Sequence, residues 1–245
     1  MRAILCKEYG PAETLVIEDV TSPVVKGHGV KVRVKAAGLN FPDTLIIEGK
    51  YQLKPTMPFS PGGEMSGEVI EIGEKVTRFK PGDRVAGLTG YGAFAEEVVV
   101  PEQNILPIPE SMSDEKAAAF SMVYGTSYYA LKQRANIQPG ETLLVLGASG
   151  GVGLATVELG KAMGAHVIAA ASTAEKLAVA KEAGADELIN YTEEPLKDAV
   201  KRHGLERPSP DHRLRGWRYP QDSGEPDAAE RLFRCWCLLG QLHPA

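Results

Sequence analysis

The sequence predicts an α/β protein in which a compact β-barrel-like domain is followed by one half of a doubly wound parallel sheet. Short strand-like segments separated by Gly/Pro turns fill residues 1–110, and apolar strands alternate with helical segments after about residue 111. A glycine-rich turn follows the first of these apolar strands. We expect domains over 1–112 and 113–201, followed by an atypical, poorly ordered tail over 202–245.

The composition excludes several classes of protein. The 245 residues are 43% hydrophobic and 24% charged, which is too apolar for a disordered chain. The net charge of −5 argues against a surface for nucleic acid or an anionic membrane. Three cysteines cannot build a disulfide framework, and neither a signal peptide nor a membrane-length apolar run is found. We therefore expect a cytoplasmic protein.

The first domain is predicted from alternating strands and turns. Residues 30–35 alternate apolar and polar side chains, as a half-buried strand does. Residues 65–72 and 93–100 are expected to form further strands, and residues 42–47 a short helix. Glycine and proline supply turns at 61–63, 80–83 and 90–92.

The second domain is predicted from a change in periodicity. Ser113 is expected to cap a helix that continues to Phe120, and a second helix is expected over 124–134. Residues 142–146 form a fully apolar strand, of the kind that is buried on both faces of a parallel sheet. The remaining elements are expected to be strands at 166–170 and 188–190 and helices at 151–163 and 173–183.

A glycine loop follows the strand at 142–146. It contains A-x-G-x-x-G (Ala148, Gly150 and Gly153), a variant of the dinucleotide fingerprint, and it opens a helix. Gly150 lets the backbone approach a pyrophosphate, Gly153 lets the helix pack on the strand, and the helix N-terminus attracts the phosphates. A tight turn without a ligand is the alternative. The cofactor contacts expected here are Ala148, Ser149, Gly150, Gly151, Val152 and Gly153.

The end of the second strand favours NADPH over NADH. An NAD site usually carries an acidic residue there, whereas this chain has three alanines and then Ser172. Ser172 and Lys176 offer a hydroxyl and a cation to a 2′-phosphate; the alternative for Lys176 is a solvated helix residue. Tyr191 is expected to lie over the adenine-ribose edge.

The tail differs in composition from the rest of the chain. Residues 1–201 contain 20 Val and 11 Ile, whereas residues 202–245 contain neither. Lysine falls from 15 residues to none, while 7 arginines and both tryptophans lie in the tail. Such a segment disfavours strands. It is interpreted either as a loop-rich extension or as a tail outside the original reading frame, with only 232–239 able to form a short packed segment.

Several ordered motifs resemble the medium-chain dehydrogenase/reductase superfamily and, within it, the zinc-free NADPH:quinone oxidoreductases related to ζ-crystallin. The resemblance covers about residues 1–201 and ends after Lys201. It implies a GroES-like domain joined to a Rossmann domain, with the active site in the cleft between them. The motifs that carry it are residues 36–43, 61–67, 80–85 and 124–131 together with the glycine loop.

The resemblance implies that no metal is used. Zinc relatives carry Cys where this chain has Asn40, and a His-Glu pair where it has Gly63-Glu64. The cysteine cluster of a structural zinc site is also missing. Cys235 and Cys237 are interpreted as an incidental or buried pair.

The resemblance also implies which residues line the nicotinamide and substrate pocket. Asn40 and Thr126 can donate hydrogen bonds to a carbonyl or to the carboxamide. Tyr51 matches a tyrosine of related enoyl reductases, which orients or protonates the acceptor; the alternative is a packing tyrosine at the rim of the cleft. Glu64 is interpreted as a packing or hydrogen-bonding remnant, and His28 and His166 as structural residues.

The function implied is hydride transfer from NADPH to a small-molecule quinone or similar enone, without zinc. A 2-enoyl thioester reductase is one alternative, and a catalytically inactive fragment that at most binds nucleotide is another. We expect no nucleic-acid or membrane partner, and a family-like homodimer would lack part of its usual C-terminal region. For the chain as written we expect weak NADPH binding and little turnover.

Overall fold

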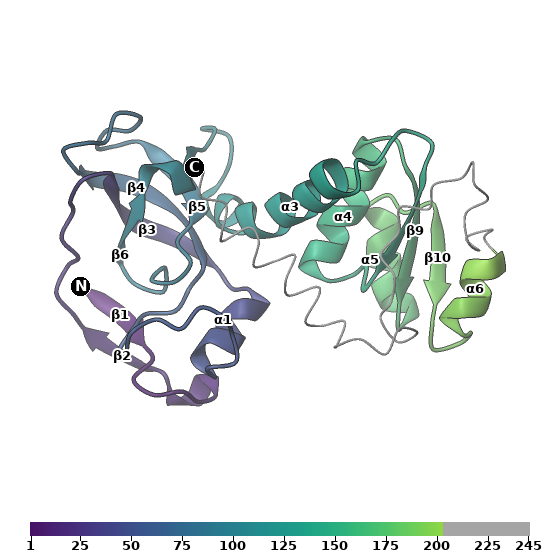
Figure 1. Cartoon of the computed structure of the whole chain (residues 1–245), viewed down its shortest axis with the longest axis horizontal. Coiled ribbons are helices and arrows are strands. Elements are labelled where there is room, and N and C mark those ends of the chain that lie inside the picture. Colours follow the sequence, from purple (N-terminus) through teal and green to yellow (C-terminus); the bar gives the residue numbers. More distant parts are fainter. Residues whose placement is uncertain (203–245) are drawn as a thin grey trace. The chain divides into compact units, whose positions relative to one another are not determined.

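The computed structural model describes residues 1–202, which divide into two compact units (Figure 1). The first unit spans Met1–Met122, and the second begins at Val123. The division falls after the expected boundary at residue 112 because helix α2 (Asp114–Ala118) packs against strands of the first unit. No helix among the described residues is long and apolar enough to cross a membrane.

The first unit is built on a five-stranded antiparallel sheet in the order β6-β3-β4-β5-β7, with a separate antiparallel pair, β1-β2. The predicted strands at 30–35 and 65–72 are confirmed within β3 and β4. The strands are β1 (Arg2–Leu5), β2 (Val16–Asp19), β3 (Gly29–Gly38), β4 (Glu64–Ile72), β5 (Arg84–Leu88), β6 (Glu97–Pro101) and β7 (Ile105–Pro107).

The expected strand at 93–100 begins later than the sequence indicates. Strand β6 starts only at Glu97. The main-chain N–H groups of Ala93 and Phe94 donate to Gly62 at 3.1 Å and to Pro61 at 2.9 Å. The N–H groups of these two residues therefore bond to the neighbouring turn, while the Phe94 carbonyl accepts from the Ile4 N–H of β1 at 2.9 Å.

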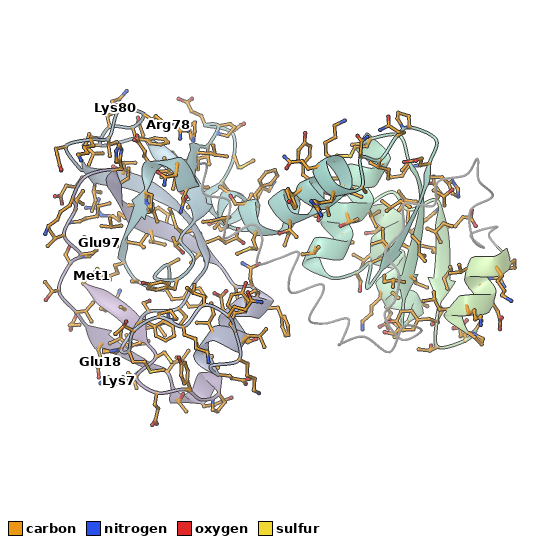
Figure 2. All side chains as sticks on the ribbon, viewed as in Figure 1. Met1, Lys7, Glu18, Arg78, Lys80 and Glu97 are labelled. Carbon is orange, nitrogen blue, oxygen red and sulfur yellow. The ribbon has the colours of Figure 1, made fainter. Side chains whose placement is uncertain are left out.

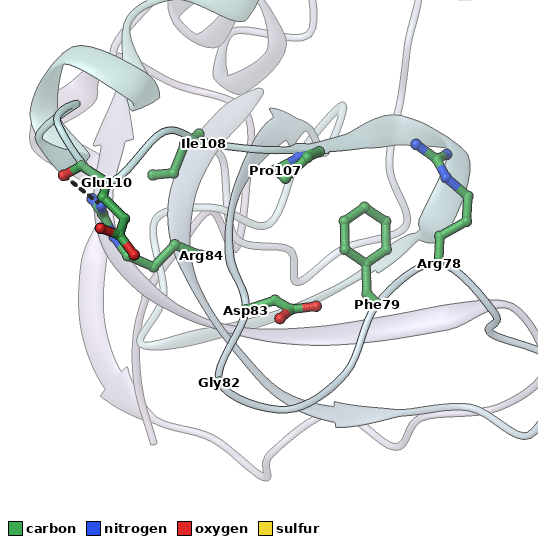
Figure 3. A pocket seen from close by; sticks show the side chains of 8 residues that line it. All are labelled: Arg78, Phe79, Gly82, Asp83, Arg84, Pro107, Ile108 and Glu110. Atoms are coloured by element: carbon green, nitrogen blue, oxygen red, sulfur yellow. Dashed lines mark hydrogen bonds between the residues drawn. The ribbon is translucent and has the colours of Figure 1, made fainter.

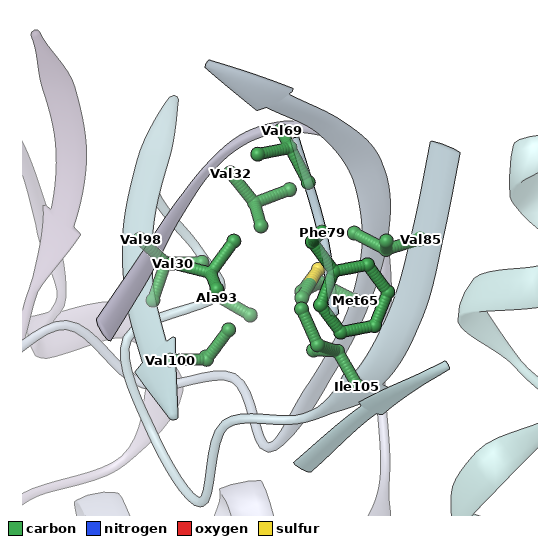
Figure 4. Close-up of a cluster of buried hydrophobic side chains, with 10 residues drawn as sticks. All are labelled: Val30, Val32, Met65, Val69, Phe79, Val85, Ala93, Val98, Val100 and Ile105. Atoms are coloured by element: carbon green, nitrogen blue, oxygen red, sulfur yellow. The ribbon is translucent and has the colours of Figure 1, made fainter. Parts of the chain in front are cut away.

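The core of the first unit is enclosed by its curved sheet (Figure 4). Inward-facing residues on β3, such as Val30 and Val32, are completely buried, as the predicted alternation requires. Burial of each large aliphatic side chain contributes about 1.5–3 kcal/mol. The buried cluster consists of Val30, Val32, Met65, Val69, Phe79, Val85, Ala93, Val98, Val100 and Ile105.

The helices of the first unit begin where the sequence predicts. Helix α1 (Phe41–Ile47) follows Asn40 and carries a proline in its first turn. Ser113 caps α2, because its side chain accepts a hydrogen bond from the Lys116 main-chain N–H at 3.4 Å. Helix α2 ends at Ala118, before the expected Phe120, and short 3₁₀ turns cover Ala12–Thr14 and Glu102–Asn104.

Charged side chains on the outer surface of the first unit include Lys7, Glu18, Arg78, Lys80 and Glu97 (Figure 2). Lys7 and Glu18, both labelled there, form an ion pair with 2.5 Å between Nζ and Oε1. Both side chains are about half exposed, so such a pair contributes little to stability.

The second unit contains a parallel sheet in the order β10-β9-β8. This arrangement confirms the predicted mononucleotide-binding half. Its strands are β8 (Thr142–Leu146), β9 (His166–Ala171) and β10 (Glu187–Asn190). Its helices are α3 (Ser121–Tyr128, which begins in the first unit), a π-helical stretch (Tyr129–Arg134), α4 (Gly151–Ala162), α5 (Ala174–Glu182) and α6 (Leu196–Arg202).

Strand β8 is less buried than the sequence predicts. Only Val145 is fully buried, and the other four residues are half-buried or exposed. Among the described residues β8 pairs with β9 alone and lies at the edge of the sheet. The central strand β9, by contrast, is buried from Val167 to Ala171. The expectations for residues 203–245, including the segment 232–239, lie outside the described residues.

Candidate functional site

The predicted cofactor residues gather at one edge of the parallel sheet. In the strand register Leu146 lies opposite Ala170, and Asn190 lies opposite Ala171. The three strands therefore end together, and the glycine loop, Ser172 and Tyr191 follow directly. In open α/β sheets this carboxyl edge is where ligands bind.

The glycine loop favours glycine at two positions, at Gly147 because of its backbone conformation and at Gly153 because of the lack of space. Gly147 has a φ of +62°, in the left-handed region that favours glycine. A Cβ on Gly153 would lie 2.3 Å from the Gly147 carbonyl oxygen and 2.9 Å from the Ala148 Cα. The loop can adopt this path because both residues are glycine.

The loop presents main chain to solvent at the start of α4. Gly150 is the N-cap residue with an extended backbone, and Gly150, Gly151 and Val152 are exposed. The first N–H groups of a helix have no acceptor within it, and they carry the positive end of the helix dipole. This surface fits the phosphates of a dinucleotide.

Ala148 and Ser149 differ in their access to a ligand. Ala148 is fully buried, and its main-chain N–H donates to the Ala170 carbonyl at 3.2 Å. Ala148 therefore joins the loop to β9, whereas Ser149 is only half-buried.

Ser172 and Lys176 lie together at the start of α5. The Lys176 Nζ donates to the Ser172 Oγ at 3.1 Å, and Lys176 is exposed. The Thr173 side chain caps α5 by accepting from the Lys176 main-chain N–H at 3.3 Å. A hydroxyl and a cation are thus presented side by side at the end of β9, as the sequence predicts.

Tyr191 follows β10 at the same edge. Its main-chain N–H donates to the Ala171 carbonyl at 3.2 Å, and its side chain is 41% exposed. The ring is therefore available to a ligand.

Side-chain hydrogen bonds join helix α3 to the start of α4. The Ser127 Oγ donates to the Val152 carbonyl at 3.1 Å, and the Thr156 Oγ1 donates to the Ser127 Oγ at 3.0 Å. Thr126, the residue before Ser127, is half-buried. One turn earlier, Tyr124 donates to Glu158, and this hydrogen bond raises the pKa of the tyrosine.

In the first unit, Asn40 lies between two buried carboxyl groups. Its main-chain N–H donates to Asp43 Oδ2 at 2.8 Å, and its side-chain Nδ2 donates to Glu64 Oε1 at 2.9 Å. The other oxygen of Glu64, Oε2, accepts from the Met122 main-chain N–H at 2.8 Å. Asp43 is 3% exposed and Glu64 is 1% exposed.

Both carboxyl groups are perturbed by burial. Burial raises the pKa of Glu64, and the nearby Asp43 raises it further, while the hydrogen bonds from Asn40 and Met122 act in the opposite direction. Burial also raises the pKa of Asp43, against hydrogen bonds from the main chain of Asn40, Gly63 and Gly62. The sequence predicts a packing or hydrogen-bonding role for Glu64, in line with these contacts, and does not single out Asp43.

Tyr51 lies just beyond the C-terminus of α1. The Lys50 N–H donates to the Leu45 carbonyl at 2.8 Å, and the Gly49 N–H donates to the Ile46 carbonyl at 3.0 Å. These two bonds, with Gly49 at a φ of +68°, form a Schellman motif. Tyr51 is half-buried and packs against the cluster of Cys6, Ile46, Ile47 and Phe59, so part of its ring serves packing.

The two histidines pair with carboxylates, in line with the structural roles expected. The His28 Nδ1 lies 3.0 Å from Glu102 Oε1, and the His166 Nε2 lies 2.6 Å from Glu187 Oε1. In the part of the chain that the structure describes, no group of three or more His, Cys, Asp or Glu residues could hold a metal ion. Cys235 and Cys237 lie outside that part.

A cavity of about 610 Å³ lies elsewhere in the first unit, beside β5 and β7 (Figure 3). None of the predicted site residues lines it. Arg84 donates from Nη2 to the Met112 carbonyl at 2.8 Å and to Asp114 Oδ1 at 3.0 Å. Arg78 lies 5.3 Å from the centre of the Phe79 ring. These arginines are engaged within the fold.

Comparisons with known proteins agree with both units. Residues 26–110 match the family "Alcohol dehydrogenase GroES-like domain", and residues 151–207 match "Zinc-binding dehydrogenase". The chain is similar to the "Quinone oxidoreductase-like protein 2 homolog" of Nematostella vectensis, with 49% identity over 82% of this chain and 55% of the relative.

Solved structures give the same result. The quinone oxidoreductase of Pseudomonas syringae superimposes with a TM-score of 0.78 at 37% identity, over 83% of this chain and 63% of that one. The Escherichia coli quinone oxidoreductase complexed with NADPH superimposes with a TM-score of 0.78 at 34% identity, over 84% and 63%.

A GroES-like domain followed by a Rossmann-like parallel sheet defines the medium-chain dehydrogenase/reductase class. Within that class, the chain belongs to the family of the quinone oxidoreductase-like proteins. It spans little more than half the length of its curated relatives, since it covers 55% of the Nematostella protein.

Proposed function

We propose that the second unit binds NADPH and that the protein is a zinc-independent reductase of quinones or similar conjugated carbonyls. The observation that carries the proposal is the carboxyl edge of the parallel sheet. There the glycine loop, the Ser172–Lys176 pair and Tyr191 follow three strands that end together.

The residues present fit a dinucleotide. The close approach of Gly153 to the Gly147 carbonyl brings the start of α4 against the loop and leaves its exposed main-chain N–H groups for the pyrophosphate. Ser172 and Lys176 would hold a 2′-phosphate, because a charge-assisted hydrogen bond from lysine and one from a hydroxyl suit a dianion. Tyr191 would cover the adenine-ribose edge.

Three side chains of the chain would act on the substrate. Bound NADPH supplies a hydride to the electrophilic carbon. The Asn40 amide and the Thr126 hydroxyl would donate hydrogen bonds to a carbonyl oxygen and so favour charge developing there. The Tyr51 hydroxyl would orient the acceptor or provide a proton. Asn40 and Gly63 stand where zinc relatives carry soft or imidazole ligands, which supports a reaction without zinc.

Removal of the Lys176 cation tests the choice of cofactor. We expect Lys176→Ala to weaken NADPH binding by roughly 10- to 150-fold, the cost of about 1.5–3 kcal/mol for a lost charge-assisted contact. NADH binding should change little, because NADH has no 2′-phosphate. Titration of both nucleotides by calorimetry measures the ratio.

Lys181→Ala is the matched control, because it removes the same charge from the other end of α5. It should leave the ratio of NADPH to NADH affinity unchanged. An unchanged ratio in Lys176→Ala would contradict the assignment of NADPH. Assays with a panel of quinones against 2-enoyl thioesters decide between the two substrate classes.

A further inference from the structure

Both oxygens of the buried Glu64 carboxyl group are committed to hydrogen bonds. Oε1 accepts from Asn40 Nδ2 at 2.9 Å, and Oε2 accepts from the Met122 main-chain N–H at 2.8 Å. The two donors come from the segment before α1 and from the start of α3. Glu64 itself is the first residue of β4, so this side chain joins three elements.

The Glu64 carboxyl group lies close against the backbone of Gly38. A Cβ on Gly38, the residue paired with Glu64 in the β3–β4 ladder, would lie 2.5 Å from Glu64 Oε1. It would also lie 2.5 Å from the Ala118 carbonyl oxygen. The carboxyl group is therefore enclosed between β3 and the C-terminus of α2.

Asn40 is held at two points by two different acids. Asp43 accepts from its main-chain N–H, and Glu64 accepts from its side-chain Nδ2. An ionised carboxylate can only accept hydrogen bonds, whereas an amide has a donor end and an acceptor end. The Asn40 Nδ2 must therefore face Glu64, while its Oδ1 faces the Asp43 main-chain N–H in the capping box of α1. This arrangement leaves the second Nδ2 hydrogen of Asn40 for another partner.

We propose that Glu64 is a positioning residue that fixes the orientation of the Asn40 amide, so that Asn40 presents its second Nδ2 hydrogen, and not its oxygen, to the substrate. This proposal rests on the role of Asn40 in the proposed function. It deepens that function by assigning a second residue to the same site. The orientation itself is a property of the free protein and can be measured without turnover.

The cost of burying Glu64 argues for more than packing. Burial of a carboxylate is unfavourable unless its charge is paired. Burial is also the main cause that raises the pKa of Glu64. A neutral side chain could fill the same volume more cheaply. A carboxylate does what a neutral amide cannot, because it accepts from Asn40 and Met122 at the same time.

The Glu64→Gln variant separates these roles. Glutamine has one acceptor oxygen and one donor nitrogen, so it cannot accept from both partners. If its oxygen stays with the Met122 N–H, its nitrogen faces Asn40 and the Asn40 amide must rotate to present Oδ1. The variant is therefore expected to reverse the amide of Asn40.

Nuclear magnetic resonance of the full ¹⁵N-labelled chain provides the readout. In the wild type, one Asn40 Nδ2 proton should be shifted downfield by the carboxylate, and it should titrate as Glu64 is protonated. The chemical shift of the Asn40 main-chain N–H should instead change as Asp43 is protonated, because Asp43 accepts its hydrogen bond. Asp43 also acts on Glu64 electrostatically. The side-chain signal of Asn40 thus reports on Glu64, and its main-chain signal reports on Asp43.

We expect Glu64→Gln to abolish the downfield shift and the titration of the Asn40 side chain, while the titration of its main-chain N–H persists. Glu68→Gln, the same change on the same strand, should leave both signals as in the wild type. If Glu64→Gln does not fold, the wild-type titration alone decides the question. Asn40 side-chain protons that do not respond to pH, or that respond equally in folded Glu64→Gln, would overturn the proposal.

Nucleotide titration of the same wild-type sample keeps the two proposals distinguishable. A chain that shows the Asn40 signature without binding NADPH would contradict the proposed function and support the positioning of Asn40. A chain that binds NADPH without the signature would contradict only the role of Glu64.

Discussion

At Gly38 the backbone of β3 comes so close to Glu64 and Ala118 that no side chain fits between them. The two contacts of an added Cβ would both be 2.5 Å, and one of them is with main chain. We expect Gly38→Ala to lower the free energy of unfolding of the first unit by about 1–3 kcal/mol, because a packed core resists overpacking. Denaturant unfolding followed by circular dichroism measures this loss.

Gly63→Ala is the matched control for this prediction. Its added Cβ would meet the end of the Met122 side chain at 3.3 Å and Asp43 Oδ1 at 3.6 Å. A flexible methionine can yield by a few tenths of an ångström, so the loss should be clearly smaller. Equal losses in the two variants would show that the enclosure of Glu64 does not limit residue 38.

Single residues were predictable where their partners are close in sequence. Ser172 and Lys176 are four residues apart, and the structure joins them at 3.1 Å. The partners of Glu64 lie 24 and 58 residues away. No local pattern indicates such contacts, because burial of a carboxyl group depends on how distant elements pack. The sequence therefore predicts only a packing or hydrogen-bonding role for Glu64. Asp43 differs, because its partner Asn40 is three residues away, and the capping-box spacing of the two residues is a local signal that could have identified it.

At the scale of elements, periodicity located the strands but not their neighbours. Residues 142–146 do form a strand, yet β8 lies at the edge of the sheet among the described residues, and most of it is only half-buried or exposed. An apolar run predicts a strand, whereas its burial depends on what pairs with it. The glycine loop was predictable because strand, turn and helix are contiguous.

An ion pair lies at the amino-terminal ends of the parallel strands, and it should make the stability of the second unit sensitive to acid. Lys161 Nζ lies 2.7 Å from Asp186 Oδ1, and the Val167 N–H donates to Asp186 Oδ2 at 2.7 Å. The Lys161 hydrogen bond is the main cause that lowers the pKa of Asp186 below its ordinary value of 3.8.

A lowered carboxyl pKa gives stability that is present above the ordinary value and lost as the pH falls through the folded value. We therefore expect the wild type to lose more stability than Asp186→Asn when the pH falls from about 5 to about 2. Thermal unfolding at a series of pH values measures the difference. Asp198→Asn, on the exposed face of α6, should behave as the wild type does. An equal loss of thermal stability with falling pH in Asp186→Asn and in the wild type would contradict this prediction.

At the scale of the whole molecule, the predicted site is divided between the two units. Asn40 and Tyr51 belong to the first unit, whereas Thr126 and the cofactor residues belong to the second. The family resemblance assigned these residues together, and the structure shows the local geometry of each group. In the proposed function, binding of nucleotide would depend mainly on residues of the second unit, while hydride transfer would need residues of both units.

This division predicts that the 245-residue chain binds NADPH but reduces quinones slowly. A doubly wound dinucleotide site uses two mononucleotide halves, and the described sheet contains the three strands β8, β9 and β10 of one half. The pyrophosphate and the 2′-phosphate need only the glycine loop and the start of α5. Hydride transfer additionally needs near-attack geometry at the nicotinamide, which residues at the other half would set.

We expect NADPH titration to show binding that Lys176→Ala weakens, and NADPH oxidation with a quinone to run well below about 1 s⁻¹, the lower end of ordinary enzyme rates. The Nematostella relative, assayed under the same conditions, serves as the full-length reference, because this chain covers 55% of it. Turnover by the 245-residue chain at the rate of that reference would contradict the prediction, since these 245 residues would then suffice for hydride transfer.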